Sequence, residues 1–334
     1  MKVEENAFSQ SRITEFVWPS KCFVIPVRCF FGSDTIRILN TDHVKTIGDA
    51  AFKHSKIKKF TWPSDCNEIP DRCFEMDECL ESISNIEHVV SIGESAFRRT
   101  AIKEFSWPKG CTIIKKHCFE DSELEKITGI EGVKEIGAYA FSQTHIASFK
   151  WPLDCDAVPL MCFNECRQLE SITGLHNVTI VISGAFEHTA LREFNWPKGC
   201  YEIPCDCFAQ SSLQYISGIE DVTDIDNRAF EGTKIEKFVW PKQCQTIPPQ
   251  CFARSSLRHI SGIESVTKIE IGAFKNSQLE EIDWPANCGT IPIECFKNVS
   301  HLKIDLSKMT TVEIEKDALC GVDEKNIVLP YYMT

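Results

Sequence analysis

The 334-residue sequence has no long apolar run, and no window approaches the roughly 20 consecutive apolar residues that a bilayer-spanning helix needs. Its first ten residues, MKVEENAFSQ, lack the apolar stretch of a secretory signal. Positive charge is scarce as well, because 36 Lys and Arg stand against 48 Asp and Glu, and the formal net charge is -12. Such a charge repels nucleic-acid phosphates and anionic lipid surfaces. We therefore expect no nucleic-acid partner and no membrane insertion.

For the residues as written, the missing signal predicts a cytoplasmic protein. The alternative is a cell-surface or secreted protein, if the chain is a fragment or is exported by another route.

The sequence also lacks the marks of a catalytic site. There is no glycine-rich loop of the kind that holds phosphate, and the nine histidines are scattered along the chain. A nucleophile, its base and an orienting group must be unlike residues that converge at one place, and no such set interrupts the pattern described below. We expect no enzymatic activity and no cofactor.

What the sequence does contain is a tandem repeat. Each tryptophan is followed by proline, and the pairs recur every 44 or 45 residues, which indicates a repeat array. We expect these tryptophans to form a structural core: Trp18, Trp62, Trp107, Trp151, Trp196, Trp240 and Trp284. Phenylalanines recur at half that period, from Phe8 to Phe296, and Leu319 continues their series. The coil is therefore 22–23 residues long, about 15 coils follow one another, and two kinds of coil alternate.

One odd coil runs from Ile102 to Phe119, and the even coil after it runs from Leu124 to Phe141. In both, the segment Phe-x-Trp or Ile-x-Gly alternates as a short strand does, and in odd coils a proline ends it. The later spacing Ile-x-x-x-Ala/Cys-Phe favours a helical turn or an irregular arc over a strand. The pattern predicts an α/β, β-rich solenoid with a parallel sheet of short strands.

Between the tryptophans, the equivalent position in even coils holds a small residue. We interpret this as packing of a buried indole over the adjacent small residue, because strands only ~4.8 Å apart would crowd two indoles. The small residues are Asn40, Asn85, Gly129, Gly174, Gly218 and Gly262.

Fourteen of the 18 cysteines stand where the neighbouring coil has valine or alanine, which favours buried free thiols. Structural zinc prefers close cysteine pairs that converge on one tetrahedron. Equivalent cysteines two coils apart would be separated by twice ~4.8 Å, beyond the ~7 Å that a disulfide allows between Cα atoms. A bond within one coil, such as Cys22 to Cys29, stays open. The off-pattern cysteines are the candidates for reactivity: Cys79, Cys166, Cys205 and Cys320.

Acidic residues recur after the even strands, at Glu87, Glu131, Glu220 and Glu264. A calcium site there would need further ligands, because these acids are two coils apart. We interpret this column as a solvated edge, and we expect no metal site.

The outward residues of the strands form the predicted binding surface, because a solenoid presents one such residue per strand at a regular pitch. In odd coils these residues are varied: Val17, Thr61, Ser106, Lys150, Asn195, Val239 and Asp283. In even coils they are almost constant: Ser84, Thr128, Thr173, Ser217 and Ser261. The hydroxyl ladder can be read as a glycan-binding or ice-like surface, but we favour a simple β-compatible polar face. The varied column is the better place for partner contacts.

The coil as a whole resembles the BspA-like subclass of leucine-rich repeats, with the pattern Leu-x-x-Ile-x-(Ile/Trp)-Pro-x-x-(Val/Cys)-x-x-Ile-x-x-x-(Ala/Cys)-Phe. The resemblance covers about residues 7 to 320, although the family usually has aliphatic residues where this chain has Trp-Pro-x-x-Cys. It implies a leucine-rich-repeat-like, curved, right-handed solenoid and a role in recognition or adhesion. Members of the family occur in bacteria and protozoan parasites, often as surface antigens.

We expect tandem repeats over residues 1–300, and an irregular, acidic last coil with a C-terminal cap over residues 301–334. Two functions fit this organisation. The first is a non-enzymatic scaffold that recognises a protein partner through the solenoid surface. The second is the ligand-binding region of a BspA-like surface adhesin, for which a glycan or the extracellular matrix would also be a partner.

Overall fold

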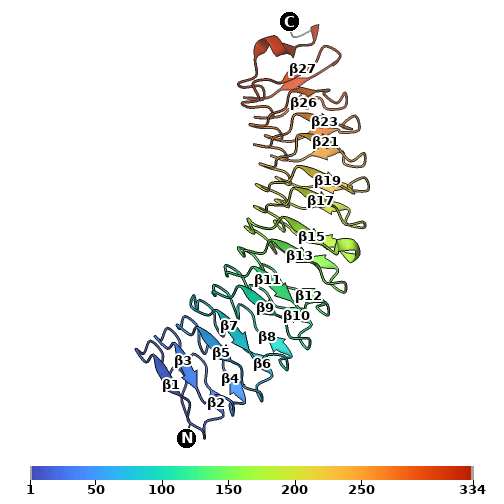
Figure 1. Cartoon of the computed structure of the whole chain (residues 1–334). Helices are drawn as coiled ribbons and strands as arrows, with labels where there is room; N and C mark the ends of the chain where they lie inside the picture. The colour runs from blue at the N-terminus through green and yellow to red at the C-terminus, as the bar shows by residue number, and fades with distance from the viewer. Residues whose placement is uncertain (1, 332–334) are drawn as a thin grey trace. The chain divides into compact units, whose positions relative to one another are not determined.

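The computed structural model describes residues 2–331, which form a parallel β-solenoid of about 14 turns. The chain divides into two compact units, residues 1–177 and residues 178–334. Within each unit, successive strands are stacked side by side (Figure 1). The last residues of the predicted cap, 332–334, lie outside the described part of the chain.

In the first unit, each coil contributes one three-residue strand to a main face. An odd strand pairs in parallel with the even strand after it, so that Phe105 lies opposite Ile127. The pairs are β1–β3, β5–β7, β9–β11 and β13–β15. The strands are β1 (Glu15–Val17), β3 (Arg37–Leu39), β5 (Lys59–Thr61), β7 (Ser82–Ser84), β9 (Glu104–Ser106), β11 (Lys126–Thr128), β13 (Ser148–Lys150) and β15 (Ser171–Thr173).

Each coil of this unit also has a second strand, two residues long, which the sequence pattern did not predict. Its inward residue is the isoleucine or valine that precedes the Ala/Cys-Phe pair. These strands are β2 (Val24–Ile25), β4 (Thr46–Ile47), β6 (Glu68–Ile69), β8 (Ser91–Ile92), β10 (Ile113–Ile114), β12 (Glu135–Ile136) and β14 (Ala157–Val158). A 3₁₀ turn, η1 (Leu175–Asn177), closes the unit.

The second unit repeats this plan in the pair β17–β19, but its last five main-face strands join into one sheet in the order β21-β23-β25-β27-β29. The strands of its main face are β17 (Glu193–Asn195), β19 (Tyr215–Ser217), β21 (Lys237–Val239), β23 (His259–Ser261), β25 (Glu281–Ile282), β27 (Lys303–Asp305) and β29 (Ile327–Val328). The second strands are β16 (Ile180–Val181), β18 (Glu202–Ile203), β20 (Asp224–Ile225), β22 (Thr246–Ile247), β24 (Lys268–Ile269), β26 (Thr290–Ile291) and β28 (Glu313–Ile314), and η2 (Glu324–Asn326) is a 3₁₀ turn.

The helical component of the expected α/β class is nearly absent, since residues 2–331 contain two 3₁₀ turns and no α-helix. The reason is the backbone around each phenylalanine. The residues two before and two after it have left-handed φ in every coil, as at His117 (57°) and Asp121 (55°) around Phe119. That conformation breaks a helix and is unfavourable by about 1–2 kcal/mol for a residue other than glycine. Hydrogen bonds to the next coil hold it, for example from His117 N–H to the Ala138 carbonyl.

The number of coils is also slightly lower than the expected 15. Fifteen phenylalanine or leucine markers, from Phe8 to Leu319, bound the intervals between them. Fifteen markers enclose 14 intervals, and each interval is one turn, so the solenoid has about 14 turns.

The core is built from columns of aromatic rings. Consecutive phenylalanines stack along each unit, with ring centroids 5.5 Å apart for Phe97 and Phe119 and 6.0 Å apart for Phe119 and Phe141. The tryptophans lie beside them, and the most exposed, Trp284, is only 7% accessible. Offset-stacked and edge-on aromatic pairs of this kind stabilise beyond their burial.

The Trp-Pro-x-x-Cys segment forms a tight turn that satisfies the buried indole. In each odd coil the cysteine N–H donates to the proline carbonyl, at 3.0 Å from Cys111 to Pro108. The cysteine carbonyl then accepts the indole N–H, at 2.8 Å from Trp107 Nε1. All seven tryptophans make this bond, so the segment supplies both a turn and a partner for the buried donor.

Our explanation for the small residues between the tryptophans was wrong, because backbone geometry decides these positions. Gly129 has φ of 77°, and a Cβ there would lie 2.6 Å from the carbonyl oxygen of Trp107. Where asparagine stands instead, its amide binds the same carbonyl, at 2.7 Å from Asn85 Nδ2 to Trp62 O. The position therefore requires left-handed backbone beside a carbonyl, which glycine and asparagine tolerate best.

Residues after 300 continue the ladder of the repeats. β27 pairs with β25, placing Ile304 opposite Ile282. Phe296 N–H donates to the Ala318 carbonyl in the next coil. In each preceding coil of this unit, the phenylalanine N–H likewise donates to an alanine or cysteine carbonyl of the coil after it. The cap proposed for residues 301–334 stays a prediction.

Candidate functional site

The predicted binding residues lie at the third position of the main-face strands or directly after them. All are exposed apart from Ser217, which is half-buried, and Val239 is the most exposed apolar residue among them at 69%. The structure brings them together in pairs across each two-strand ladder, and Ser84 Oγ lies 3.3 Å from Thr61 Oγ1. The other pairs in register are Val17 with Leu39, Ser106 with Thr128, Lys150 with Thr173, Asn195 with Ser217, and Val239 with Ser261, while Asp283 follows β25.

Sequence reasoning missed a second outward column, formed by the first residue of each main-face strand. Only the middle residue of a three-residue strand points inward, so the first and third share the outer face. The period-two alternation contains this signal, because the residues on both sides of an inward residue point outward. The missed residues are Glu15, Arg37, Lys59, Ser82, Glu104, Lys126, Ser148, Ser171, Glu193, Tyr215, Lys237, His259, Glu281 and Lys303.

Two grooves of this face lie where an even strand meets the next odd strand without pairing with it. β7 and β9 belong to different sheets, and a groove of about 830 Å³ lies over them. β19 and β21 are likewise in different sheets, under a groove of about 1240 Å³. In an odd coil the tryptophan N–H extends the ladder to the next strand, as from Trp107 to the Thr128 carbonyl. The even coil has a left-handed residue at the equivalent position, such as Gly129.

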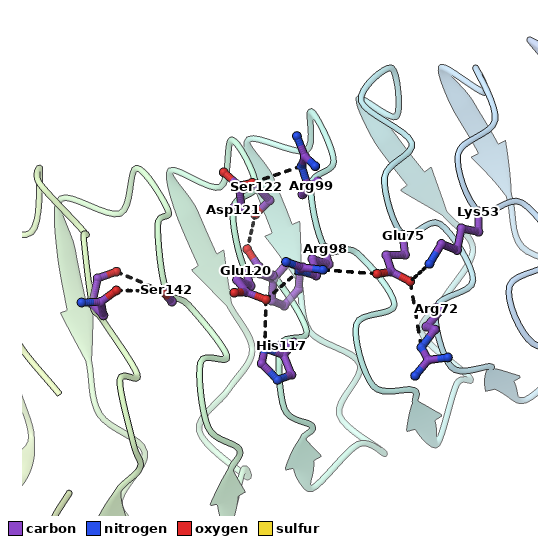
Figure 2. A network of polar contacts seen from close by, with 12 residues as sticks. Lys53, Arg72, Glu75, Arg98, Arg99, His117, Glu120, Asp121, Ser122 and Ser142 are labelled. Carbon is purple, nitrogen blue, oxygen red and sulfur yellow. Dashed lines mark hydrogen bonds and ion pairs between the residues drawn. The ribbon is translucent and has the colours of Figure 1, made fainter. Parts of the chain in front are cut away.

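A separate ladder of charges crosses four consecutive coils of the first unit, at the turns around their core phenylalanines (Figure 2). Lys53 Nζ and Arg98 Nη1 lie 2.6 and 3.4 Å from the buried carboxylate of Glu75. Arg98 Nε lies 2.6 Å from Glu120 Oε2, and His117 Nδ1 lies 2.9 Å from the same oxygen. Glu75 lies between cations from both neighbouring coils, and Glu120 pairs with Arg98 of the preceding coil, so we assign this ladder to stability rather than to recognition.

The cysteines are free thiols, and 15 of the 18 are buried. Burial raises the pKa of the Cys111 thiol and of the Cys200 thiol to about 11, so neither is a thiolate near neutral pH. The Sγ of Cys111 lies 3.4 Å from the Val89 carbonyl oxygen one coil earlier, which gives this column a structural use. Burial also raises the pKa of the off-pattern Cys166 and Cys205 to about 11. Neither has the lowered pKa of an activated nucleophile.

A buried position of the first unit holds a carboxyl group, that of Asp77. Asp77 accepts hydrogen bonds from Ser55 Oγ at 2.6 Å and from the Ile57 and Cys79 N–H groups. Equivalent positions in the following coils hold Thr100 and Ser122, which are uncharged. Burial dominates over these bonds and raises the pKa of Asp77 to about 7. The group therefore changes charge near neutral pH.

Within residues 2–331, His, Cys, Asp and Glu form no group of three or more that could hold a metal ion. The acidic column Glu87, Glu131, Glu220 and Glu264 is exposed, and two of its members line the grooves. No helix in this part of the chain is both long and apolar enough to cross a membrane.

Comparison with solved structures finds proteins that are similar to this chain. A leucine-rich repeat protein from Bacteroides ovatus is 19% identical to this chain, with a TM-score of 0.68 over 96% of this chain and 79% of the other. A leucine-rich cell surface protein from Faecalibacterium prausnitzii is 18% identical, with a TM-score of 0.48 over 93% of this chain and 80% of the other. At 19% identity, the likeness to the Bacteroides ovatus protein concerns the fold alone. A search of curated protein sequences found no match.

The sequence itself matches the family described as "BspA type Leucine rich repeat region (6 copies)", at residues 1–123, 90–214, 179–303 and 223–333. Together these matches span nearly the entire chain and confirm the resemblance that the coil pattern indicated. The protein belongs to the BspA type leucine-rich repeat family.

Proposed function

We propose that this protein is a non-enzymatic binding protein that recognises a protein partner through the outward residues of its main-face strands. The supporting observation is the contrast between the two sides of these strands. The inward residues are phenylalanine or isoleucine from Phe105 to Ile304. The outward residues of neighbouring strands change from Tyr215 to Lys237 to His259. Core packing restricts the inward residues to these types, whereas the outward residues can vary to match the surface of a partner.

Regular spacing suits this face to an extended partner. Parallel strands present their outward side chains about 4.8 Å apart, and each strand offers two of them. Many weak contacts can then add up along the stack, as in other solenoids.

The proposal is tested by arginine substitution on the main face of the first unit. Ser106→Arg and Thr128→Arg place bulk and charge beside each other on exposed positions of paired strands. Gln143→Arg, on an exposed tight turn, is the matched control. Binding to proteins of the source cells and to a panel of immobilised matrix proteins is measured by biolayer interferometry. We expect weaker binding for the strand variants only, and equal binding by all three would refute the proposal.

The second candidate is the ligand-binding region of a surface adhesin, in a secreted or surface-exposed protein. Membership of the BspA type family supports it. Three thiols can distinguish the compartments, because Cys320 is exposed and Cys79 and Cys205 are half-exposed. Protein from its native source is alkylated before and after reduction, and these residues are read by mass spectrometry. Free thiols at all three favour the cytoplasmic scaffold, and oxidised ones favour the adhesin.

A further inference from the structure

The groove between β19 and β21 differs from the rest of the main face. Its floor is apolar and buried, formed by Ile216, Phe238 and Trp240. Its sides carry two large exposed apolar residues, Tyr215 at 60% and Val239 at 69% accessibility. Exposed apolar side chains beside an apolar floor are a common feature of binding sites, because a ligand can remove all of them from water together.

The chain provides an internal comparison. The groove between β7 and β9 has the same position in the repeat and a similar floor, including Phe105 and Trp107. Its equivalents of Tyr215 and Val239 are Ser82 and Ser106. The fold therefore makes the groove at both places, and the side chains make it apolar at only one. This difference does not follow from packing, because all four residues point outward.

Charge sets the second groove apart as well. Lys234, Lys237 and Lys242 line it, are exposed, and have no ion-pair partner within residues 2–331. Two acids, Glu220 and Glu236, also line it. At the position of Lys237 the β7–β9 groove has Glu104. The β7–β9 groove has two lysines and two acids, Lys109, Lys126, Glu87 and Glu104. In the β19–β21 groove the three lysines exceed the two acids by one, and this excess favours an anionic ligand.

The groove also has polar groups suited to a peptide backbone. Ser217, Ser261 and His259 line it together with Gln214, and all four carry hydrogen-bonding side chains. The volume of about 1240 Å³ exceeds the roughly 300–1,000 Å³ of typical small-molecule pockets. A segment of several residues suits that space better than a single small metabolite.

We propose that the groove between β19 and β21 binds an extended acidic peptide segment of a partner protein. A large aliphatic or aromatic side chain of the segment packs between Tyr215 and Val239. Carboxylates on either side of it pair with Lys237 and Lys242. This inference rests on the proposed function and specifies the partner for one part of the main face.

The test is a selection of displayed random peptides on the intact chain. The double variant Tyr215→Ser/Val239→Ser, which copies Ser82 and Ser106 of the other groove, serves for counter-selection. Both residues are exposed, so the double variant should fold normally, and its melting temperature checks this. We expect enriched sequences in which Asp or Glu flank a large apolar residue.

One enriched peptide is then synthesised, and its Kd is measured by fluorescence polarisation. Tyr215→Ser and Lys237→Glu should each weaken binding about tenfold or more, as expected for an aromatic anchor and a charge reversal. Tyr201→Ser and Lys198→Glu are the matched controls, since both residues are exposed in the same unit outside the groove, and they should leave the Kd unchanged. Added salt should weaken binding to the unmodified chain.

Three results would overturn the inference: no enrichment over the double variant, enrichment of basic or purely polar peptides, or equal Kd values for the groove variants and the controls. A glycan array signal that requires Tyr215, without any enriched peptide, would assign the groove to a saccharide instead. The proposed function fails separately, through the Ser106 and Thr128 variants of the first unit.

Discussion

The indole Nε1 of Trp151 donates a 2.9 Å hydrogen bond to the carbonyl oxygen of Cys155, four residues further along the chain. The same bond, at 2.8–2.9 Å, recurs at every tryptophan. A large apolar side chain is thus buried without an unpaired donor, and the turn that follows the strand is fixed in the same step. This bond explains how the repeat buries a tryptophan at this position without leaving its N–H unpaired.

Trp151→Ala should lower the free energy of unfolding by about 3–5 kcal/mol, because it empties a large buried volume. Trp151→Phe keeps an aromatic ring but leaves the Cys155 carbonyl without its donor, and the smaller loss should be about 1–3 kcal/mol. Urea unfolding followed by circular dichroism measures both. Unchanged midpoints would mean that the indole is not part of the core.

Gly174→Ala should destabilise the first unit by about 2–4 kcal/mol, through left-handed backbone and a steric clash together. The residue has φ of 86°, and a Cβ would lie 2.7 Å from the Trp151 carbonyl oxygen. Gly132→Ala is the control, because a Cβ at Gly132 meets nothing within 4 Å. Thermal unfolding of the two variants should differ clearly, and equal melting temperatures would contradict the backbone account.

Stability should fall as pH rises above about 9, because buried thiols hold their protons longer in the folded chain. The pKa of Cys111 is raised from 9.0 to about 11, so the unfolded chain loses this proton first and is favoured between these values. Each such thiol contributes a slope of about 1.4 kcal/mol per pH unit in that window.

Cys111→Val, which copies Val133 of the next coil, should reduce that slope in chemical unfolding at pH 9 to 11. Cys320→Ser, at an exposed position, should leave the slope unchanged. A steeper or equal slope in Cys111→Val would show that the buried thiol does not govern alkaline unfolding.

Asp77 should make the chain more stable at pH 5 than at pH 8. Its folded pKa of about 7 exceeds the ordinary value of 3.8, so the folded chain binds the extra proton between these values. Stability from this group is complete below pH 4 and is lost as pH rises through 7. The difference should be about 2 kcal/mol. Asp77→Thr, which copies Thr100, should abolish this component, and a pH dependence identical to that of the unmodified chain would refute the assignment.

The repeated columns could be predicted from the sequence because each is dictated by one packing environment. A position such as Phe119 recurs in every coil, so its inward direction is visible as a period. The turn around each phenylalanine could not be predicted, because its left-handed backbone falls on residues as different as His117, Tyr139 and Asp206. Hydrogen bonds between coils stabilise these conformations, and no local propensity marks them.

The grooves were invisible for a different reason. They lie where neighbouring coils meet, so they depend on residues of more than one coil and not on the pattern within either. Tyr215 and Lys237 became candidates only when the structure placed them on one groove. Their types were conspicuous in the sequence, but they stand two positions before the predicted column residues, Ser217 and Val239.

The central claim, that the main face is the recognition surface, is tested most directly by site-specific photo-cross-linking. A benzophenone amino acid is introduced at Ser106, Lys150 or Val239 on that face, and at Gln143 or Arg254 on exposed tight turns. Each variant is irradiated in extracts and on intact cells of the source organism. The account predicts discrete cross-linked protein adducts from the three face positions and none from the tight turns. Adducts from the tight turns alone, or from no position, would contradict it.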